Sequence, residues 1–108
     1  MREEWPDIVA ESDKKLVLVF FTGTGCVPCA RLKKDMRSEG PPADKVVVYT
    51  LDCWADPEAQ AVASVQNIKQ VPTLILLKNR RVAAMWQGYK GPADWKGVLQ
   101  TIYRMLQE

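Results

Sequence analysis

The sequence predicts an α/β domain in which helices and strands follow one another in the order αβαβαββα. Four short runs rich in apolar or β-branched residues are typical of strands, and helix-like stretches separate the first three of them. The first run, residues 16–21, is apolar throughout, which indicates a central strand that is covered on both faces. These patterns place a sheet in the interior with helices packed against it.

Two helices and two strands are predicted in the first half of the chain. Residues 22–25 form a flexible turn after the first strand, and residues 26–39 are helix-like until a Gly-Pro-Pro sequence stops them. Residues 46–51, rich in valine, tyrosine and threonine, predict the second strand. Before all of these, residues 2–11 suit a short helix that a Ser-Asp pair ends, and its apolar residues cluster: Trp5, Ile8 and Val9.

The second half is predicted to hold a helix, a hairpin and a final helix. Residues 56–58 give an Asp cap, a proline and an acid in the first turn, and Asn67 could end that helix in the left-handed conformation. Residues 73–77 and 82–87 predict a β-hairpin joined by residues 78–81. The last helix follows a Gly-Pro-Ala-Asp start and carries an apolar stripe: Trp95, Val98, Leu99, Ile102, Met105 and Leu106.

Length and composition narrow the class of protein. A chain of 108 residues predicts a single domain, residues 1–108, and 47% apolar with 26% charged residues excludes disorder and collagen-like repeats. The formal charge, 15 basic minus 13 acidic residues, is +2, which is too weak to indicate nucleic-acid binding. We expect the densest basic stretches to be solvated faces: Arg31, Lys33 and Lys34, then Lys78, Arg80 and Arg81.

The counts of cysteine and histidine restrict the chemistry further. The chain has three cysteines and no histidine, which excludes Ser/His and Cys/His nucleophile pairs. A structural zinc ion takes four ligands, so three thiols without an imidazole argue against a zinc site. We therefore expect no metal and no cofactor, and chemistry that uses thiols, carboxylates, amines or backbone groups.

The sequence shows no signal peptide and no membrane-spanning stretch. A signal peptide begins with a basic segment that an apolar segment follows, and the N-terminus has neither. The longest apolar runs fall far short of the ~20 residues that a membrane helix needs. We therefore expect a cytoplasmic location with no membrane partner. In that reducing compartment cysteines are more often catalytic than structural.

The candidate reactive site is the sequence Cys26-Val27-Pro28-Cys29, where a buried strand ends and a helix begins. At a helix start, unpaired N–H groups and the positive end of the helix dipole favour a thiolate at Cys26. Pro28 suits the first turn, and one turn of helix brings Cys29 close enough to resolve a mixed disulfide. The alternative is a pair of buried core cysteines without a reaction.

With these features the sequence resembles the thioredoxin family over about residues 14 to 106. The strand 16–21, the Cys-x-Pro-Cys helix start, the segment from Asn67 to Leu74 with its Val-Pro-Thr sequence, and the hairpin with its following Gly88 stand in the family's order and spacing. The resemblance implies a three-layer sandwich around a mixed sheet. The family's first strand has no counterpart, so we expect four strands.

The resemblance also implies the residues that bind substrate. It predicts a cis peptide bond between Val71 and Pro72 beside the cysteines, where the backbone can receive an extended peptide. A trans proline that starts an edge strand is the alternative. Gly88 matches a family glycine that lets substrate backbone approach. The expected substrate-binding residues are Gly25, Val27, Pro28, Val71, Pro72 and Gly88.

Five positions depart from the family. Gly25 and Thr22 stand where thioredoxins typically have tryptophans, and Phe20 replaces a buried aspartate thought to help deprotonate the second cysteine; the lysine that often pairs with it is matched by Val48. No buried carboxylate is therefore expected to serve Cys29 as a base. We expect resolution of the mixed disulfide to depend more steeply on pH than in the family. Val27, in place of the usual glycine, makes the loop bulkier and can shift the redox potential in a direction that the sequence does not give.

The remaining cysteine and three aromatic residues allow two interpretations each. Cys53 is either a partly buried core residue, which we favour, or a regulatory or dimer-forming thiol. Trp54 beside it either covers the end of the sheet or is an exposed contact. Trp86 and Tyr89 flank Gly88 and either form an aromatic docking surface or pack across the hairpin.

The sequence thus predicts a monomeric thioredoxin-type enzyme that reduces protein disulfides, with Cys26 as nucleophile and Cys29 as resolving thiol. Its role would be electron transport and cell redox homeostasis, with a thioredoxin-reductase-like or glutathione-linked electron donor. Two alternatives remain open at this point. One is a glutaredoxin-like or oxidising exchanger, and the other is an adaptor of the same fold whose redox activity is incidental.

Overall fold

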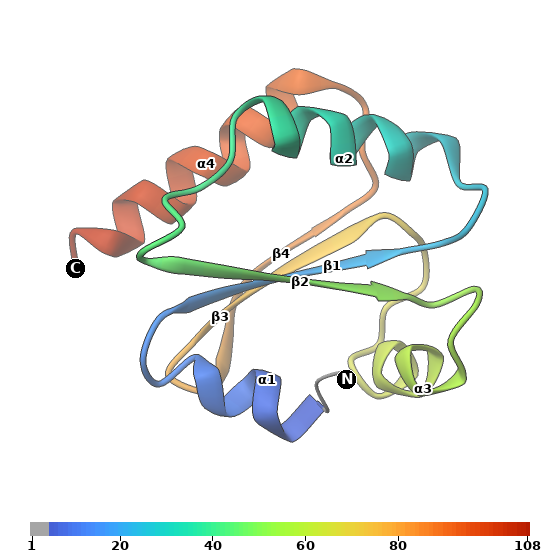
Figure 1. Ribbon diagram of the computed structural model, residues 1–108, viewed down its shortest axis with the longest axis horizontal. Coiled ribbons are helices and arrows are strands. Elements are labelled where there is room, and N and C mark those ends of the chain that lie inside the picture. The colour runs from blue at the N-terminus through green and yellow to red at the C-terminus, as the bar shows by residue number, and fades with distance from the viewer. Residues whose placement is uncertain (1–4) are drawn as a thin grey trace.

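The computed structural model describes residues 5–108, and its elements follow the predicted order (Figure 1). Residues 2–4 of the first predicted helix lie outside the described residues. The elements are α1 (Trp5–Glu11), β1 (Leu16–Thr22), α2 (Val27–Ser38), β2 (Val46–Asp52), α3 (Pro57–Val65), β3 (Thr73–Lys78), β4 (Arg81–Gln87) and α4 (Pro92–Leu106). Each element from β1 onward lies within one or two residues of its predicted bounds, and α1 ends at Glu11 as predicted.

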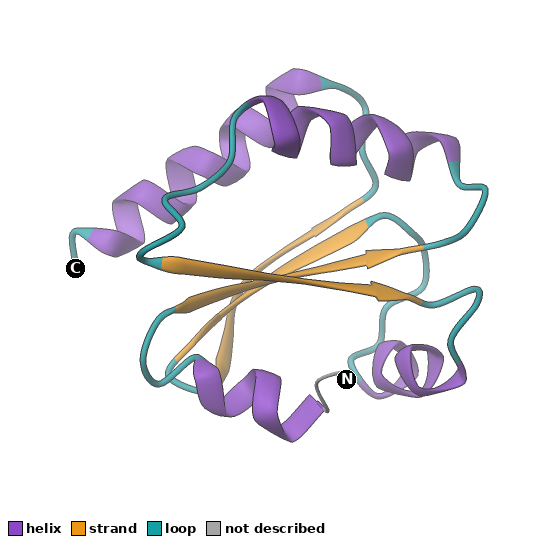
Figure 2. Cartoon of the chain, viewed as in Figure 1, coloured by secondary structure: helices purple, strands orange, loops and turns teal. Residues whose placement is uncertain are grey.

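The four strands form one mixed sheet in the order β2-β1-β3-β4. β1 is parallel to β2 and antiparallel to β3, and β3 is antiparallel to β4. Helices α2 and α4 cover one face of the sheet and α1 and α3 the other, so the molecule has three layers (Figures 1 and 2). The predicted α/β sandwich with a four-stranded mixed sheet is confirmed.

The central position of β1 divides the core into two halves. Successive side chains of a strand point to opposite faces, and here they alternate between two buried clusters. Leu16, Leu18 and Phe20 pack with residues of α2 and α4. Val17, Val19 and Phe21 pack with residues of α1 and α3. Because both faces of this strand are covered, its side chains are apolar without interruption.

Two turn residues were predicted well and one connection was not. The Asp56 side chain accepts a hydrogen bond from Glu58 N–H and caps α3, and Asn67 follows that helix with a φ of 60°. The hairpin connection predicted over residues 78–81 is shorter, because only Asn79 and Arg80 lie outside the strands. Both have positive φ, 51° and 68°, which gives the backbone twist that joins two antiparallel strands through two residues.

The basic residues of α2 agree with the sequence prediction. Arg31, Lys33 and Lys34 are exposed on α2, as expected of a solvated face. No helix within residues 5–108 has the length and apolar character that crossing a membrane requires.

Candidate active site

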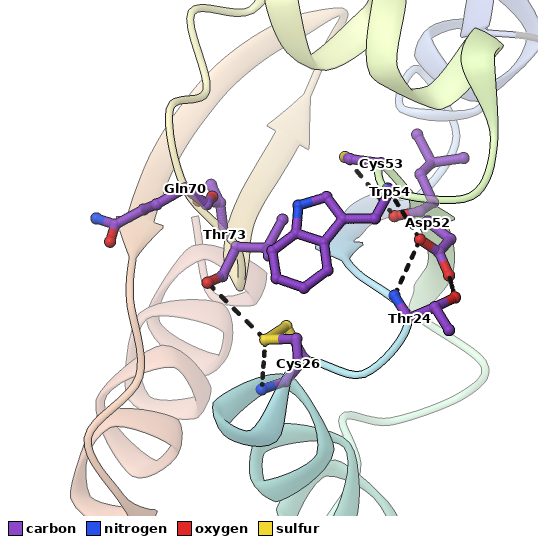
Figure 3. The surroundings of a disulfide bond; sticks show 10 residues. Thr24, Cys26, Asp52, Cys53, Trp54, Gln70 and Thr73 are labelled. Carbon is purple, nitrogen blue, oxygen red and sulfur yellow. Dashed lines mark hydrogen bonds between the residues drawn. A yellow bond between two sulfur atoms is a disulfide. The ribbon is translucent and has the colours of Figure 1, made fainter.

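The candidate active site lies where β1 ends and α2 begins, at the C-terminal end of this central strand. Cys26 and Cys29 form a disulfide there, with their Cα atoms 5.2 Å apart (Figure 3). The two cysteines differ in access, since Cys29 is 3% exposed within the core and Cys26 is 9% exposed at its surface. Val27 between them is 63% exposed. An incoming group would therefore meet Cys26 before Cys29.

Cys26 is the N-cap residue of α2. Its sulfur accepts a hydrogen bond from the backbone N–H of Cys29 at 3.2 Å. Pro28 lies in the first turn, where no intrahelical bond needs its missing N–H. In the reduced protein a negative charge on this sulfur would be stabilised by that N–H and by the positive end of the helix dipole.

Gly25, directly before the motif, has a φ of +84°. A side chain is strained in this left-handed region, so the turn that leads into Cys26 favours glycine. The sequence showed that the family's tryptophan is absent here. The backbone gives the physical reason why glycine suits the position.

The segment around Pro72 approaches the sulfur from β3. The peptide bond between Val71 and Pro72 is cis, as the family resemblance implied. The carbonyl oxygen of Val71 lies 4.0 Å from Cys26 Sγ. Gly88 donates its N–H to the carbonyl of Pro72 at 2.8 Å, which fixes the end of β4 against this segment. Cys26, Val71, Pro72 and Gly88, distant in sequence, are therefore brought together.

The surroundings of Cys29 are apolar. It shares a buried cluster with Phe20, Leu32 and Leu74. Among residues 5–108 the buried polar side chains are those of Ser12 and Thr73, and neither is a carboxylate. The absence of a buried acid near Cys29, expected from Phe20, therefore holds for the described part of the chain.

Asp52 links the loop after β1 to the loop after β2, and sequence reasoning gave it no role. Its carboxylate accepts hydrogen bonds from the side chain and backbone of Thr24, and from the N–H groups of Trp54 and Ala55 at 3.0 Å. The hydrogen bond from the Thr24 hydroxyl, with help from the backbone N–H groups, lowers the pKa of Asp52. An aspartate at the end of a strand is a common turn former, which was the available signal.

Trp54 is the exposed aromatic residue beside the disulfide. Its side chain is 62% exposed, and its indole lies against the backbone of Gly23. By contrast, Trp86 and Tyr89 are only partly exposed and pack against the core between the sheet, α2 and α4. The Tyr89 hydroxyl also donates a hydrogen bond to Asp35. The packing interpretation of this pair is the better supported of the two.

Cys53 lies in the core on the opposite side of the sheet from the disulfide. It is 8% exposed, and burial, with the nearby charges of Asp52 and Asp56, raises the pKa of its thiol. These surroundings fit the core interpretation and make the thiol a poor nucleophile. Within the described residues, no three Cys, Asp or Glu side chains gather in a way that could hold a metal ion.

A dithiol motif at a strand-to-helix junction, a cis-proline segment beside it and a sheet of this order define a thioredoxin-fold protein with a redox-type disulfide. Residues 6–103 match the model of a family described as a thioredoxin-like domain. The chain belongs to the thioredoxin family.

Individual relatives support this assignment. Thioredoxin F1 of Arabidopsis thaliana, a chloroplastic protein, is 31% identical over 86 residues, which cover 80% of this chain and 47% of that protein. A chloroplastic F-type thioredoxin of Brassica napus matches with the same identity and 46% coverage of its own length. The chain therefore spans about half the length of these curated relatives.

Solved structures show the same fold. Thioredoxin f from spinach chloroplast in its short form has 27% identity and a TM-score of 0.70, covering 92% of this chain and 85% of that one. The thioredoxin of Malassezia sympodialis has a TM-score of 0.77 at 21% identity, with 94% and 87% coverage. At that identity the likeness supports the fold alone.

Proposed function

We propose that this chain is a thioredoxin-type thiol–disulfide oxidoreductase that reduces protein disulfides. The observation that carries the proposal is the Cys26–Cys29 disulfide at the start of α2, with the N–H of Cys29 donated to the Cys26 sulfur. Two thiols so placed can cycle between dithiol and disulfide, and the capped sulfur is the one that the helix start favours as an anion.

The reaction would run in two exchange steps. The Cys26 thiolate attacks one sulfur of a substrate disulfide, forming a mixed disulfide and releasing the other substrate sulfur as a thiolate. Cys29 then loses its proton and attacks the Cys26 sulfur. The second substrate thiolate leaves, and the two electrons from the enzyme dithiol now reside in the substrate. The enzyme ends as the Cys26–Cys29 disulfide.

Substrate would bind on the surface around Cys26. We assign it to the exposed Val27 with Gly25 and Pro28 on one side, and to the backbone of Val71 with Pro72 and Gly88 on the other. The Val71 carbonyl beside the sulfur supports this, because an extended peptide can lie along exposed backbone of this kind.

The electron donor and location follow from the same chemistry. Regeneration of the dithiol needs a reductant, which we propose to be a thioredoxin-reductase-like or glutathione-linked donor. We retain the cytoplasm as the proposed compartment because it is reducing. The curated relatives are chloroplastic, so a plastid is the alternative compartment against which the cytoplasm should be tested. We further propose that the protein acts as a monomer without nucleic acid or membrane partners.

Insulin disulfide reduction with dithiothreitol as donor tests the proposal. The wild type should accelerate insulin reduction. Cys26→Ser should be at least 100-fold slower, because the attacking sulfur is gone. Cys29→Ser should accumulate a mixed disulfide that mass spectrometry detects. Cys53→Ser, a change at the buried third thiol, is the matched control and should keep the wild-type rate. Equal, negligible rates for wild type and Cys26→Ser would contradict the proposal.

A further inference from the structure

We infer that Trp54 is a specificity-determining residue, and that the hollow beside it receives an apolar side chain adjacent to the substrate cysteine. The inference rests on the proposed disulfide reduction and extends it to the choice of substrate. Three observations carry it: the exposure and fixed position of Trp54, the hollow between Trp54 and Val71, and the contact of Val71 with the Cys26 sulfur.

Trp54 is exposed but held in place. Although 62% of its side chain is accessible, one side of the indole lies on the backbone of Gly23, three residues before Cys26. The Asp52 carboxylate binds the N–H of Trp54 and the Thr24 side chain together, so the two loops form one unit. A large aromatic ring fixed before binding loses little conformational freedom when a partner covers it.

A hollow of about 470 Å³ lies next to Trp54 on the side of α3. Its apolar lining comes mainly from Trp54, Ala63, Ile68 and Val71. Lys69 is the charged member of the lining, and polar groups of Gln60, Ser64 and Gln70 complete it. An apolar side chain would contact the indole and this apolar lining, while its backbone stayed near the polar groups.

The hollow borders the reaction centre through Val71. Val71 lines it, and the carbonyl of the same residue lies 4.0 Å from Cys26 Sγ. In Figure 3 the indole projects from the Asp52–Trp54 segment toward the side on which Thr73 and Cys26 lie. A substrate sulfur must reach Cys26, and the next residue of an extended chain stands about 3.3 Å further along. The side chain of one such neighbour therefore falls over the surface between Val71 and Trp54.

The experiment compares matched peptides with one internal disulfide, in which the residues flanking both cysteines are Leu, Ser or Asp. The wild type should reduce the Leu peptide with a kcat/KM about tenfold above that of the Ser peptide, since burial of one aliphatic side chain accounts for such a factor. Trp54→Ala should bring this ratio close to one, mainly through a higher KM for the Leu peptide. Trp54→Phe should restore most of the ratio.

Tyr103→Ala serves as the matched control, because Tyr103 is an exposed aromatic residue of α4, on the other face of the sheet. It should keep the wild-type ratio. Equal rates for the three peptides, or a ratio that Trp54→Ala leaves unchanged, would overturn the inference while leaving disulfide reduction in place. A best rate for the Asp peptide would also overturn it, in favour of charge recognition by Lys69. Failure of the wild type to reduce any peptide would instead refute the proposed function.

Discussion

Gly23 lies beneath the indole ring of Trp54, so close that a Cβ atom at position 23 would stand 2.3 Å from the ring atom Cδ2. The two residues come from different loops, one after β1 and the other after β2. Glycine is required here by the space that the ring occupies. The contact shows that the turn before the CxxC motif and the segment carrying Trp54 are shaped for one another.

The contact predicts a non-additive pair of substitutions. Gly23→Ala should lower the free energy of unfolding by about 1 kcal/mol, because the indole must leave its position on the backbone. In a Trp54→Ala background the same change should have almost no effect, since the ring is gone. Urea denaturation of the four proteins measures the coupling.

Gly97 gives this cycle a matched control. It lies inside α4, and a Cβ atom there would meet nothing within 4 Å. Gly97→Ala should therefore stabilise the protein by about 0.5–1 kcal/mol through helix propensity, whichever residue is at position 54. An equal loss from Gly23→Ala in both backgrounds would show that the indole is not the group displaced.

Asp52 should make the stability depend on acid pH. Its folded-state pKa lies below the usual value of 3.8, chiefly through the Thr24 hydroxyl. Stability gained in this way is present above that usual value and is lost as the pH falls through the folded pKa. Asp52→Asn should therefore flatten the decline in stability between about pH 5 and pH 2. Urea midpoints across this range test it, with the exposed Asp44→Asn as control. Parallel curves for wild type and Asp52→Asn would contradict the assignment.

Ionisation of Tyr89 should lower the stability of the protein at alkaline pH. Burial, followed by its hydrogen bond to the Asp35 carboxylate, raises the pKa of the phenol. A group with a raised folded pKa stabilises fully below its unfolded pKa, about 10 for tyrosine, and this contribution is lost as the pH rises beyond it. Tyr89→Phe should lower the free energy of unfolding by about 1 kcal/mol at pH 7. Its stability should fall less than that of the wild type above about pH 10.

Denaturation curves between pH 7 and pH 11 measure both effects of Tyr89→Phe. Tyr103→Phe removes the hydroxyl of an exposed tyrosine on α4 and should follow the wild type throughout. If Tyr89→Phe declined as steeply as the wild type, ionisation of Tyr89 would not limit alkaline stability.

Sequence patterns predicted the features that depend on neighbouring residues. The apolar run of β1 indicated a strand covered on both faces, and the Asp56 cap and the left-handed Asn67 are local preferences that the fold keeps. The motif at the start of α2 was found for the same reason. Cys26 needs only the first turn of its own helix to acquire its N–H contact.

The features that the sequence did not reveal depend on residues far apart in the chain. The Thr24–Asp52 bonds join positions 28 apart, and the Tyr89–Asp35 bond joins positions 54 apart. No local pattern distinguishes Asp35 from other surface carboxylates. The position of Asp52 at the end of a strand indicates a turn but does not identify Thr24 as its partner. The same holds for Trp54, whose two interpretations separated only once the loop of Gly23 was placed beneath it.

The surroundings of Cys29 lead to a prediction about the second step of the proposed reaction. Cys29 is buried with Phe20, Leu32 and Leu74, and the cluster of described residues around it holds no carboxylate to take its proton. An unassisted cysteine thiol is mostly protonated at neutral pH, and only the thiolate attacks. The rate of resolution should therefore rise with pH, by up to about tenfold per unit, between about pH 6 and pH 8.

Stopped-flow measurement can isolate this step. The mixed disulfide is formed with substrate in excess over the enzyme, and its decay is then followed at each pH. Cys53→Ser should be used beside the wild type, so that the third thiol cannot contribute to the decay. Both proteins should give the same rising profile, since Cys53 lies on the other side of the sheet. A rate independent of pH would mean that a group outside the buried cluster deprotonates Cys29, and the apolar replacement at Phe20 would then have no kinetic consequence.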